Sequence, residues 1–128
     1  MRLLLDTHAL IWATLSPGLL SRKAAKAIAD PGNIIYVSAA SAWEISTKVR
    51  LGKLPDAEML ETNFLDAMND AGYSLLPIEV AQGLRAGRLP GPHRDPFDRM
   101  IAAQALASDI PIVSLDTALD CFGVRRIW

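Results

Sequence analysis

Four acidic residues of this chain lie just beyond apolar segments, and their type and placement suggest metal chemistry. They are Asp6, Glu44, Asp98 and Asp116. The strands of a parallel α/β sheet deliver the residues after their carboxyl ends to one edge, where ligands bind. Carboxylates gathered there would repel each other by about 3 kcal/mol per pair, at ~5 Å and an effective dielectric of ~20. Protonation or a shared cation relieves that repulsion, and oxygen-rich sites select Mg²⁺ or Mn²⁺. The pattern predicts a metal-dependent phosphodiesterase.

The elements that must position these acids alternate along the chain. Short apolar or β-branched runs predict strands at 2–5, 34–37, 73–76 and 111–114, with a fifth edge strand at 124–127. Helical patterns cover 7–15, 21–29, 38–51, 56–71, 79–86, 98–108 and 117–122. The 56–71 helix carries an apolar stripe of Met59, Leu60, Phe64, Leu65 and Met68. This alternation predicts one α/β domain over residues 1–128, with helices on both faces of a parallel sheet.

Each acid also has a plainer structural explanation. Asp6 could cap the first helix, although Thr7 could do so equally well and leave Asp6 free at the sheet edge. Glu44 lies one turn inside its helix and could form an exposed pair with Lys48, worth ~0.3–0.5 kcal/mol. Asp116 could cap the last short helix. The functional interpretation therefore depends on the four positions taken together.

The third acid has a rival close by in the chain. Asp95 precedes a proline, which favours an extended backbone and the role of helix cap. Asp98 then falls in the first helical turn and can face the strand ends, so we prefer Asp98 as the metal ligand. His93 lies close to the expected site and could contact phosphate or stabilise its loop. His8, on the first helix, is expected at the surface.

Composition narrows the class of protein further. The 128 residues include 13 basic and 14 acidic side chains, for a net charge of −1. Without the four acids above, 13 cations face 10 acids, and a net +3 does not indicate bulk electrostatic binding to duplex DNA. Cys121 is the single cysteine, which excludes an intrachain disulfide and a thiolate cluster. We expect it to pack as a small apolar residue near a helix end.

Two local groups of cations could still meet a nucleic acid. Lys48, Arg50 and Lys53 end the Glu44 helix, where cations also suit the helix dipole. A second group accompanies the loop that delivers Asp98: Arg85, Arg88, Arg94 and Arg99. Arg94 and Arg99 are the candidate phosphate contacts, because guanidinium groups match phosphate oxygens. Arg99 could instead pair with Asp95.

Taken in order, the four acidic segments resemble those of PIN-domain ribonucleases, and in particular the VapC-type toxins of bacterial toxin–antitoxin pairs. The segments are LLLDTHALIW, VSAASAWEISTKVRLGKL, HRDPFDRMIAAQA and IVSLDTALDCFGVRRIW. The resemblance implies a PIN-like three-layer α/β/α fold with about five parallel strands. It also implies one or two Mg²⁺ or Mn²⁺ ions at the four acids. Ser114 stands where this family often has Thr before the fourth acid, so a hydroxyl is retained as a tentative substrate contact.

The same resemblance implies an activity and partners. The activity would be endonucleolytic hydrolysis of structured RNA, with Asp6 and Asp98 as direct ligands. Glu44 and Asp116 would act through waters, orient the nucleophile or complete a second ion. Partners would be a small antitoxin protein and a second copy of the chain, as a homodimer. The start of the chain does not resemble a signal peptide and no run approaches ~20 apolar residues, so a cytoplasmic protein without membrane contact is expected.

Two other classes of function compete with the nuclease. The first is a catalytically inactive PIN-like module that binds RNA or a protein. The second is an aspartate-nucleophile phosphohydrolase or phosphate-receiving domain, because Asp6 also ends the first strand. That class expects a second early acid, whereas the residue two after Asp6 is His8. The chain has neither a Gly-x-x-x-x-Gly-Lys phosphate loop nor a Gly-x-Ser-x-Gly elbow.

Overall fold

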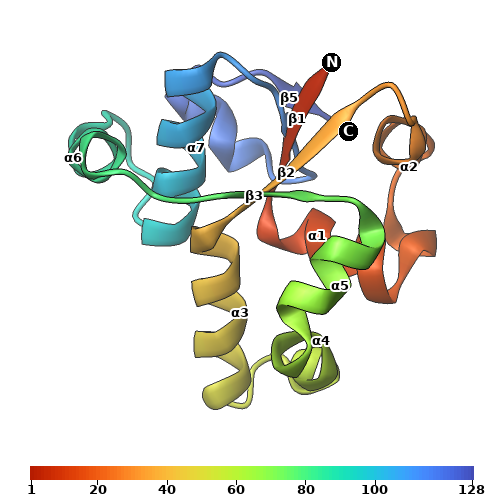
Figure 1. Ribbon diagram of the computed structural model, residues 1–128. Helices are drawn as coiled ribbons and strands as arrows, with labels where there is room; N and C mark the ends of the chain where they lie inside the picture. The colour runs from red at the N-terminus through yellow and green to blue at the C-terminus, as the bar shows by residue number, and fades with distance from the viewer.

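The centre of the molecule is a sheet of five parallel strands in the order β3-β2-β1-β4-β5 (Figure 1). The computed structural model describes all residues from Met1 to Trp128. The strands are β1 (Arg2–Leu5), β2 (Ile34–Ser38), β3 (Ser74–Leu76), β4 (Ile112–Val113) and β5 (Arg126–Ile127). All five predicted strands are confirmed, the last three being shorter than expected. The α/β prediction with a parallel sheet is therefore confirmed.

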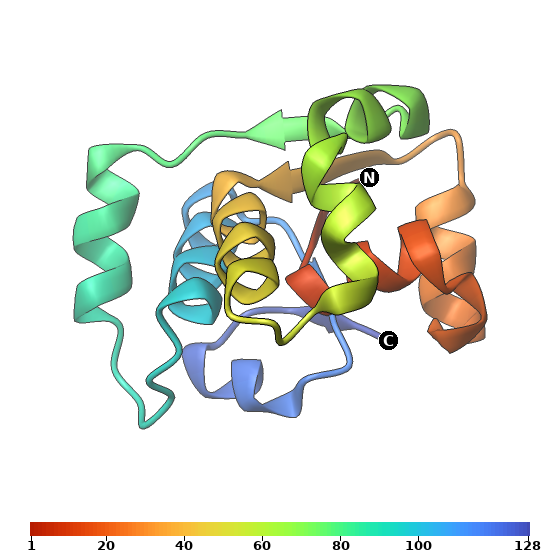
Figure 2. The same cartoon turned by 90° about the horizontal axis from the view of Figure 1, so that it is seen from below.

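Helices cover both faces of the sheet and make three layers (Figures 1 and 2). They are α1 (Thr7–Leu15), α2 (Arg22–Ala29), α3 (Ala39–Arg50), α4 (Glu58–Thr62), α5 (Phe64–Ala71), α6 (Val80–Arg88) and α7 (Pro96–Ser108). Short 3-10 turns add η1 (Pro17–Leu19), η2 (Pro55–Ala57) and η3 (Thr117–Phe122). In Figure 1, α6 and α7 lie on one side of the sheet, and α1, α2 and α5 lie on the other.

The first strand shows how the sequence builds both layers. Leu3 and Leu5 belong to a buried cluster shared with α1, α2, α3 and α5, whereas Leu4 belongs to the cluster on the α7 side. This alternation is the period-two pattern of a strand. Both faces of β1 are covered, so all three leucines are fully buried. The sequence of the strand is therefore a continuous apolar run and does not alternate between apolar and polar residues. The carboxyl end of β1 is thus fixed at the middle of the sheet.

Polar caps set the starts of the helices that carry the later acids. The Ser38 side chain accepts a hydrogen bond from the Ala40 amide at 3.0 Å and starts α3. Asp95 accepts from the amides of Phe97 at 2.8 Å and Asp98 at 3.3 Å, as predicted, and starts α7. At the other end of α3, Gly52 adopts a positive φ of 73°, the left-handed conformation that glycine tolerates best.

The predicted helix over 56–71 is wrong in one respect, because it is divided at Asn63. The backbone of Asn63 is distorted (φ −109°, ψ 26°), and its side-chain amide donates to the Met59 carbonyl at 3.1 Å. Asparagine commonly competes with the backbone in this way. The predicted apolar stripe is also only partly buried: Leu60 and Met68 are in the core, whereas Met59 and Leu65 are exposed.

Cys121 differs from its expected place. It lies in η3 and is exposed, because the buried side of this short turn is supplied by Leu119 and Phe122. A 3-10 turn places residues three apart on one side, and 119 and 122 have that spacing. No helix of the structure has the length and apolar character needed to cross a membrane.

Candidate active site

The strand order creates a crevice at the carboxyl end of the sheet. The chain proceeds from β1 outward through β2 to β3, then returns to the other side of β1 for β4 and β5. Adjacent strands β1 and β4 therefore lead their following loops in opposite directions, and such switch points are where open parallel sheets bind ligands. Asp6 directly follows β1, and Asp116 lies in the turn after β4.

Asp6 serves as a helix cap and also faces the crevice. Its Oδ1 accepts from the Ala9 amide at 2.7 Å, while Oδ2 accepts from the Ser114 hydroxyl. The suggestion that Thr7 might take over the cap is wrong, because the Thr7 hydroxyl donates to the Ser41 hydroxyl instead, at 3.1 Å. Burial raises the pKa of Asp6 against the lowering effect of these two hydrogen bonds, and the charge of Glu44 raises it further.

Glu44 projects from α3 into the same region and is only 3% exposed. Its Oε2 accepts from the Lys48 ammonium, but Oε1 is buried without any hydrogen-bond partner. The alternative of a solvated Glu44–Lys48 pair is therefore wrong about burial, although the pair itself exists. A buried carboxylate oxygen without a partner is costly, and each such oxygen calls for a ligand or another explanation.

Asp98 lies in the first turn of α7 and faces the crevice, as preferred from the sequence. Its Oδ2 is 2.8 Å from His93 Nε2. Burial raises the pKa of Asp98 to about 6; the hydrogen bond with His93 opposes this rise, and the charges of Asp95 and Glu44 add to it. The Glu44 charge acts on both Asp6 and Asp98, so these three carboxylates are electrostatic neighbours.

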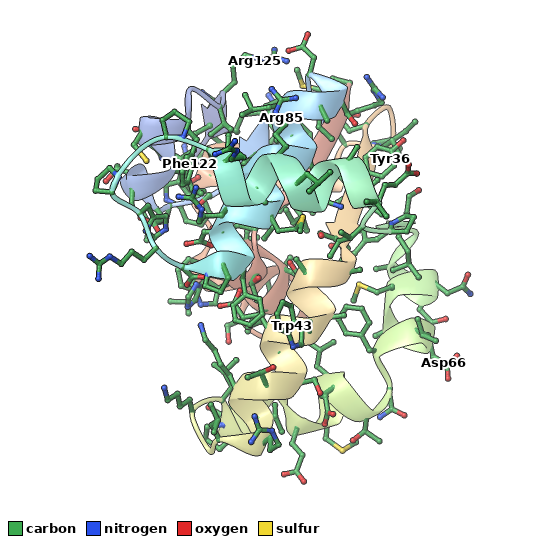
Figure 3. All side chains as sticks on the ribbon, turned by 90° about the vertical axis from the view of Figure 1, so that its left-hand side faces the viewer. Tyr36, Trp43, Asp66, Arg85, Phe122 and Arg125 are labelled. Carbon is green, nitrogen blue, oxygen red and sulfur yellow. The ribbon has the colours of Figure 1, made fainter.

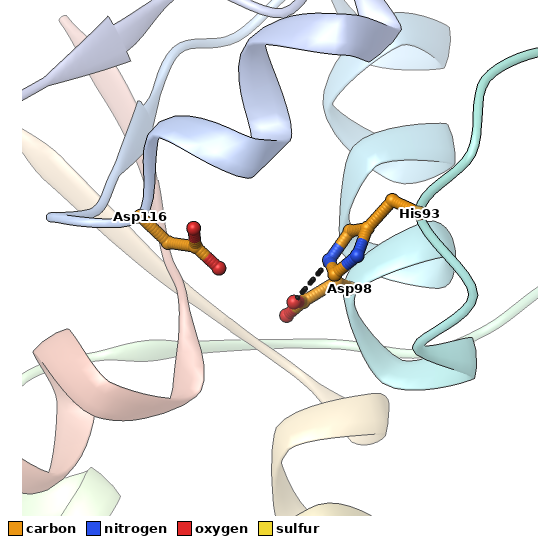
Figure 4. A group of neighbouring side chains, drawn as sticks. All are labelled: His93, Asp98 and Asp116. Atoms are coloured by element: carbon orange, nitrogen blue, oxygen red, sulfur yellow. Dashed lines mark hydrogen bonds and ion pairs between the residues drawn. The ribbon is translucent and has the colours of Figure 1, made fainter.

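Asp116 completes the group from the far side of the crevice (Figure 4). It caps η3 by accepting from the Ala118 amide at 2.9 Å, and it remains exposed. One ligand atom from each of His93, Asp98 and Asp116 lies within 4.8 Å of the others. Asp6 and Asp116 also line one cavity, so the fold gathers all four predicted acids.

The donor set fits a hard divalent cation. Carboxylate oxygens dominate it, one of them buried without a partner, and the pKa values of Asp6 and Asp98 are raised by burial. A cation among them would stabilise the charged forms and satisfy the open oxygen of Glu44. Oxygen ligands suit Mg²⁺ or Mn²⁺, and a single nearby imidazole without thiolates does not make a zinc centre.

Ser114 has a different task from the substrate contact expected of it. It is fully buried, its hydroxyl donates to Asp6, and the same oxygen accepts from the Asp116 amide at 2.9 Å. One hydroxyl therefore links the residues that follow β1 and β4. The geometry supports a positioning role for Ser114 and leaves its oxygen little freedom to meet a substrate.

The side chain of Arg99 is also used in hydrogen bonds within the protein. Its guanidinium donates to the carbonyls of Ala86 at 3.0 Å, His93 at 2.9 Å, and Leu89. These contacts fasten the loop between α6 and α7 and replace both suggested roles, the phosphate contact and the pair with Asp95. Arg94, in the same loop, is exposed and stays available for phosphate.

We expect Arg99→Ala to lower the free energy of unfolding by roughly 2–3 kcal/mol, because it leaves partly buried carbonyls without their charged donor. Arg99→Lys should recover only part of this loss, since an ammonium cannot span three acceptors as a guanidinium does. Urea unfolding measures both changes. Arg94→Ala is the matched control and should stay within about 0.5 kcal/mol of the parent. Equal losses for Arg94→Ala and Arg99→Ala would contradict the fastening role.

The sequence interpretation missed three features around the acids. His93 contacts Asp98 directly, Lys48 pairs with a buried rather than an exposed Glu44, and Trp12 lines the cavity beside Asp6. The i,i+4 spacing of Glu44 and Lys48 predicted their pairing, but it carries no signal for the burial of Glu44. The first and third depend on how the 87–96 loop and α1 pack, which the local sequence does not specify.

The architecture and its acidic edge define an α/β protein with a carboxylate-lined crevice. A crystal structure of VapBC2 from Rickettsia felis bound to a DNA fragment from its promoter shares this fold, with a TM-score of 0.70. That likeness covers 98% of this chain and 97% of the other at 13% sequence identity, so it bears on the fold alone. A family model of the PIN domain matches residues 3–123. The chain therefore belongs to the PIN-domain family.

A partial sequence relative is Ribonuclease VapC16 from Mycobacterium tuberculosis. The two are 44% identical over 54 residues, which is 42% of this chain. The match spans 38% of the relative's own length. The family membership rests on the match of the PIN-domain model and does not depend on this partial relative.

Proposed function

We propose that this chain is a metal-dependent endoribonuclease whose Asp6, Glu44, Asp98 and Asp116 hold Mg²⁺ or Mn²⁺. The observation that carries the proposal is the buried Oε1 of Glu44, which has no hydrogen-bond partner although the Glu44 charge acts on both Asp6 and Asp98. A buried position that only stabilised the fold would rarely keep a carboxylate oxygen without a hydrogen-bond partner. The preference for RNA, and for structured RNA in particular, draws support from the resemblance to ribonucleases.

The roles of the four acids follow from their surroundings. Asp6 and Asp98 would be direct ligands, because burial raises the pKa of each and a cation reverses that effect. Glu44 and Asp116 would bind through water, orient the nucleophile or complete a second ion. A bound divalent cation supplies a water of lowered pKa and neutralises charge on the scissile phosphate.

A second set of residues would keep the acids in place. The Ser114 hydroxyl fixes one oxygen of Asp6, and the His93 imidazole contacts one oxygen of Asp98. Lys48 holds one oxygen of Glu44 and leaves the other without a partner. Such outer contacts orient metal ligands and typically matter by about 10- to 100-fold in affinity or activity.

The biological setting is part of the same proposal. We take residues 1–128 as one PIN domain that acts in the cytoplasm as the toxin of a toxin–antitoxin pair, restrained by a small antitoxin protein and able to form a homodimer. The matches to a VapC ribonuclease and to a VapBC2 complex support this setting. Exposed apolar side chains on α3, α5 and α6 offer surface for such contacts: Trp43, Leu65, Val80 and Leu84. Figure 3 shows Trp43 on α3.

The proposal is tested by incubating the purified chain, free of antitoxin, with total cellular RNA in Mg²⁺, Mn²⁺ or EDTA. Discrete fragments that require the metal are expected. A folded protein that binds Mn²⁺ but leaves single candidate RNAs intact would favour the alternative of an inactive PIN-like binding module. Cleavage that persists in EDTA would contradict the metal site.

A further inference from the structure

A cavity of about 430 Å³ opens beside the proposed metal site and contains more than acids. It is lined by Asp6, His8, Trp12, Leu115, Asp116 and Thr117. Two of these residues belong to the four carboxylates, and the other four have no part in the proposed metal chemistry. The volume falls within the range of small-ligand sites. Acids therefore form one end of this cavity, and aromatic and aliphatic groups form the rest.

The side chain of Trp12 packs against two neighbouring rings at the edge of this cavity. Its ring centroid is 5.6 Å from that of His8, one helical turn earlier on α1, and 5.7 Å from that of Trp128, at tilts of 50° and 55°. Trp128 packs against one of the two core clusters, whereas Trp12 belongs to neither. Trp12 thus presents a fixed aromatic surface without supporting the core.

The remaining lining suits a flat polar ligand better than a purely apolar one. Leu115, in the turn after β4, is 52% exposed and leaves about half of its surface open. Thr117 and His8 bring a hydroxyl and an imidazole that can donate or accept hydrogen bonds. A nucleobase combines an apolar face with a hydrogen-bonding edge, and proteins bind unpaired bases by stacking them on aromatic side chains.

We propose that this cavity is a base-binding subsite in which an unpaired nucleobase stacks on Trp12 while the adjoining phosphodiester lies toward the cation that Asp6 and Asp116 would help to hold. The inference rests on the proposed ribonuclease function and adds a residue that selects where the RNA is cut. Trp12 contacts the substrate without touching the reacting bond. Its loss should weaken productive binding and leave the chemical step largely intact.

Binding can be followed without any cleavage by using AMP, which contains no phosphodiester bond. The chain has three tryptophans, so an ¹⁵N–¹H spectrum of the Mg²⁺-loaded protein contains three indole signals; Trp12→Phe assigns that of Trp12, and Trp43→Phe assigns that of Trp43. AMP is expected to shift the Trp12 signal and leave Trp43, which packs on Phe97, unmoved. Ribose 5-phosphate, which lacks the base, should leave Trp12 unmoved. Equal shifts from both ligands, or none at Trp12 with AMP, would overturn the subsite.

RNA cleavage by Trp12 variants provides a second test of the subsite. Trp12→Leu should lower kcat/KM for RNA roughly 10-fold, mainly through KM, and Trp12→Phe should recover most of it, as expected for one base–aromatic stack. Thermal unfolding shows that both variants are folded. Wild-type kcat/KM in Trp12→Leu would refute the subsite and leave the ribonuclease standing. AMP binding at Trp12 with no RNA cleavage by the parent would refute the ribonuclease instead.

Discussion

Replacing Asp98 by Asn should lower RNA cleavage by at least roughly 10³-fold while raising the melting temperature of the metal-free protein near neutral pH. The activity falls because the amide cannot supply the charge that a divalent cation requires. The stability rises because burial raises the pKa of Asp98 to about 6, so its ionised form opposes folding at pH 7. Cleavage rates and calorimetry on the same preparation measure the two changes.

Asp95→Asn is the matched control for this prediction. Asparagine caps helices as well as aspartate, so the hydrogen bonds to the Phe97 and Asp98 amides should survive. We expect cleavage within about threefold of the parent, since a surface-like change at a preserved cap costs little. If Asp95→Asn lost activity and Asp98→Asn kept it, the third metal ligand would be Asp95 and the assignment to Asp98 would be wrong.

The metal-free protein should lose stability between pH 5 and pH 7.5, and divalent cations should restore more of it at the higher pH. The folded pKa of Asp98, about 6, lies above its ordinary value of 3.8, so the folded state binds the proton more tightly than the unfolded state. The stability from this group is complete below 3.8 and is lost as the pH rises through 6. Asp6 is shifted in the same direction.

Melting temperatures with EDTA and with Mn²⁺, at both pH values, test this linkage. A cation at about 100 times its Kd adds roughly 2.7 kcal/mol, and proton competition reduces that gain at pH 5. Other titrating groups are removed by subtracting the same data for Asp98→Asn, whose profile should be flatter. A larger Mn²⁺ effect at pH 5 than at pH 7.5, or parallel profiles for the two proteins, would contradict the raised carboxylate.

The layout of the fold was accessible from the sequence because its strong signals are local. The continuous run at 3–5 specified a buried parallel strand, and Ser38, Asp95 and Gly52 marked helix ends that the structure retains. The strand order was not accessible, since it depends on which strands pair across the sheet. That order places Asp116 beside Asp6, which are 110 positions apart in the chain.

The acids were weighed as if capping and ligand binding excluded each other, and the structure shows why they do not. A carboxylate has two oxygens, so Asp6 caps α1 with one and meets Ser114 with the other. Asp116 caps η3 and still lies near Asp98. Helix starts at the carboxyl edge of a sheet are therefore positions where one acid performs both tasks.

The misjudged residues share a dependence on distant packing. Arg99 reaches carbonyls up to 13 positions away, whereas its phosphate role was inferred from the match of guanidinium to phosphate and from its place beside the acids. The exposure of Cys121 follows from which side chains of η3 the core accepts, and composition does not fix that.

In the proposed mechanism, water activated at the four-acid site attacks the RNA phosphate. The chemistry of the new RNA ends tests it most directly, because direct hydrolysis does not pass through the neighbouring 2′-hydroxyl. Fragments made with Mg²⁺ or Mn²⁺ should carry no 2′,3′-cyclic phosphate, and a single 2′-deoxynucleotide at the cut site should remain cleavable. Cyclic phosphate ends, or resistance of that 2′-deoxy substrate, would show that the 2′-hydroxyl is the nucleophile and would contradict the proposed mechanism.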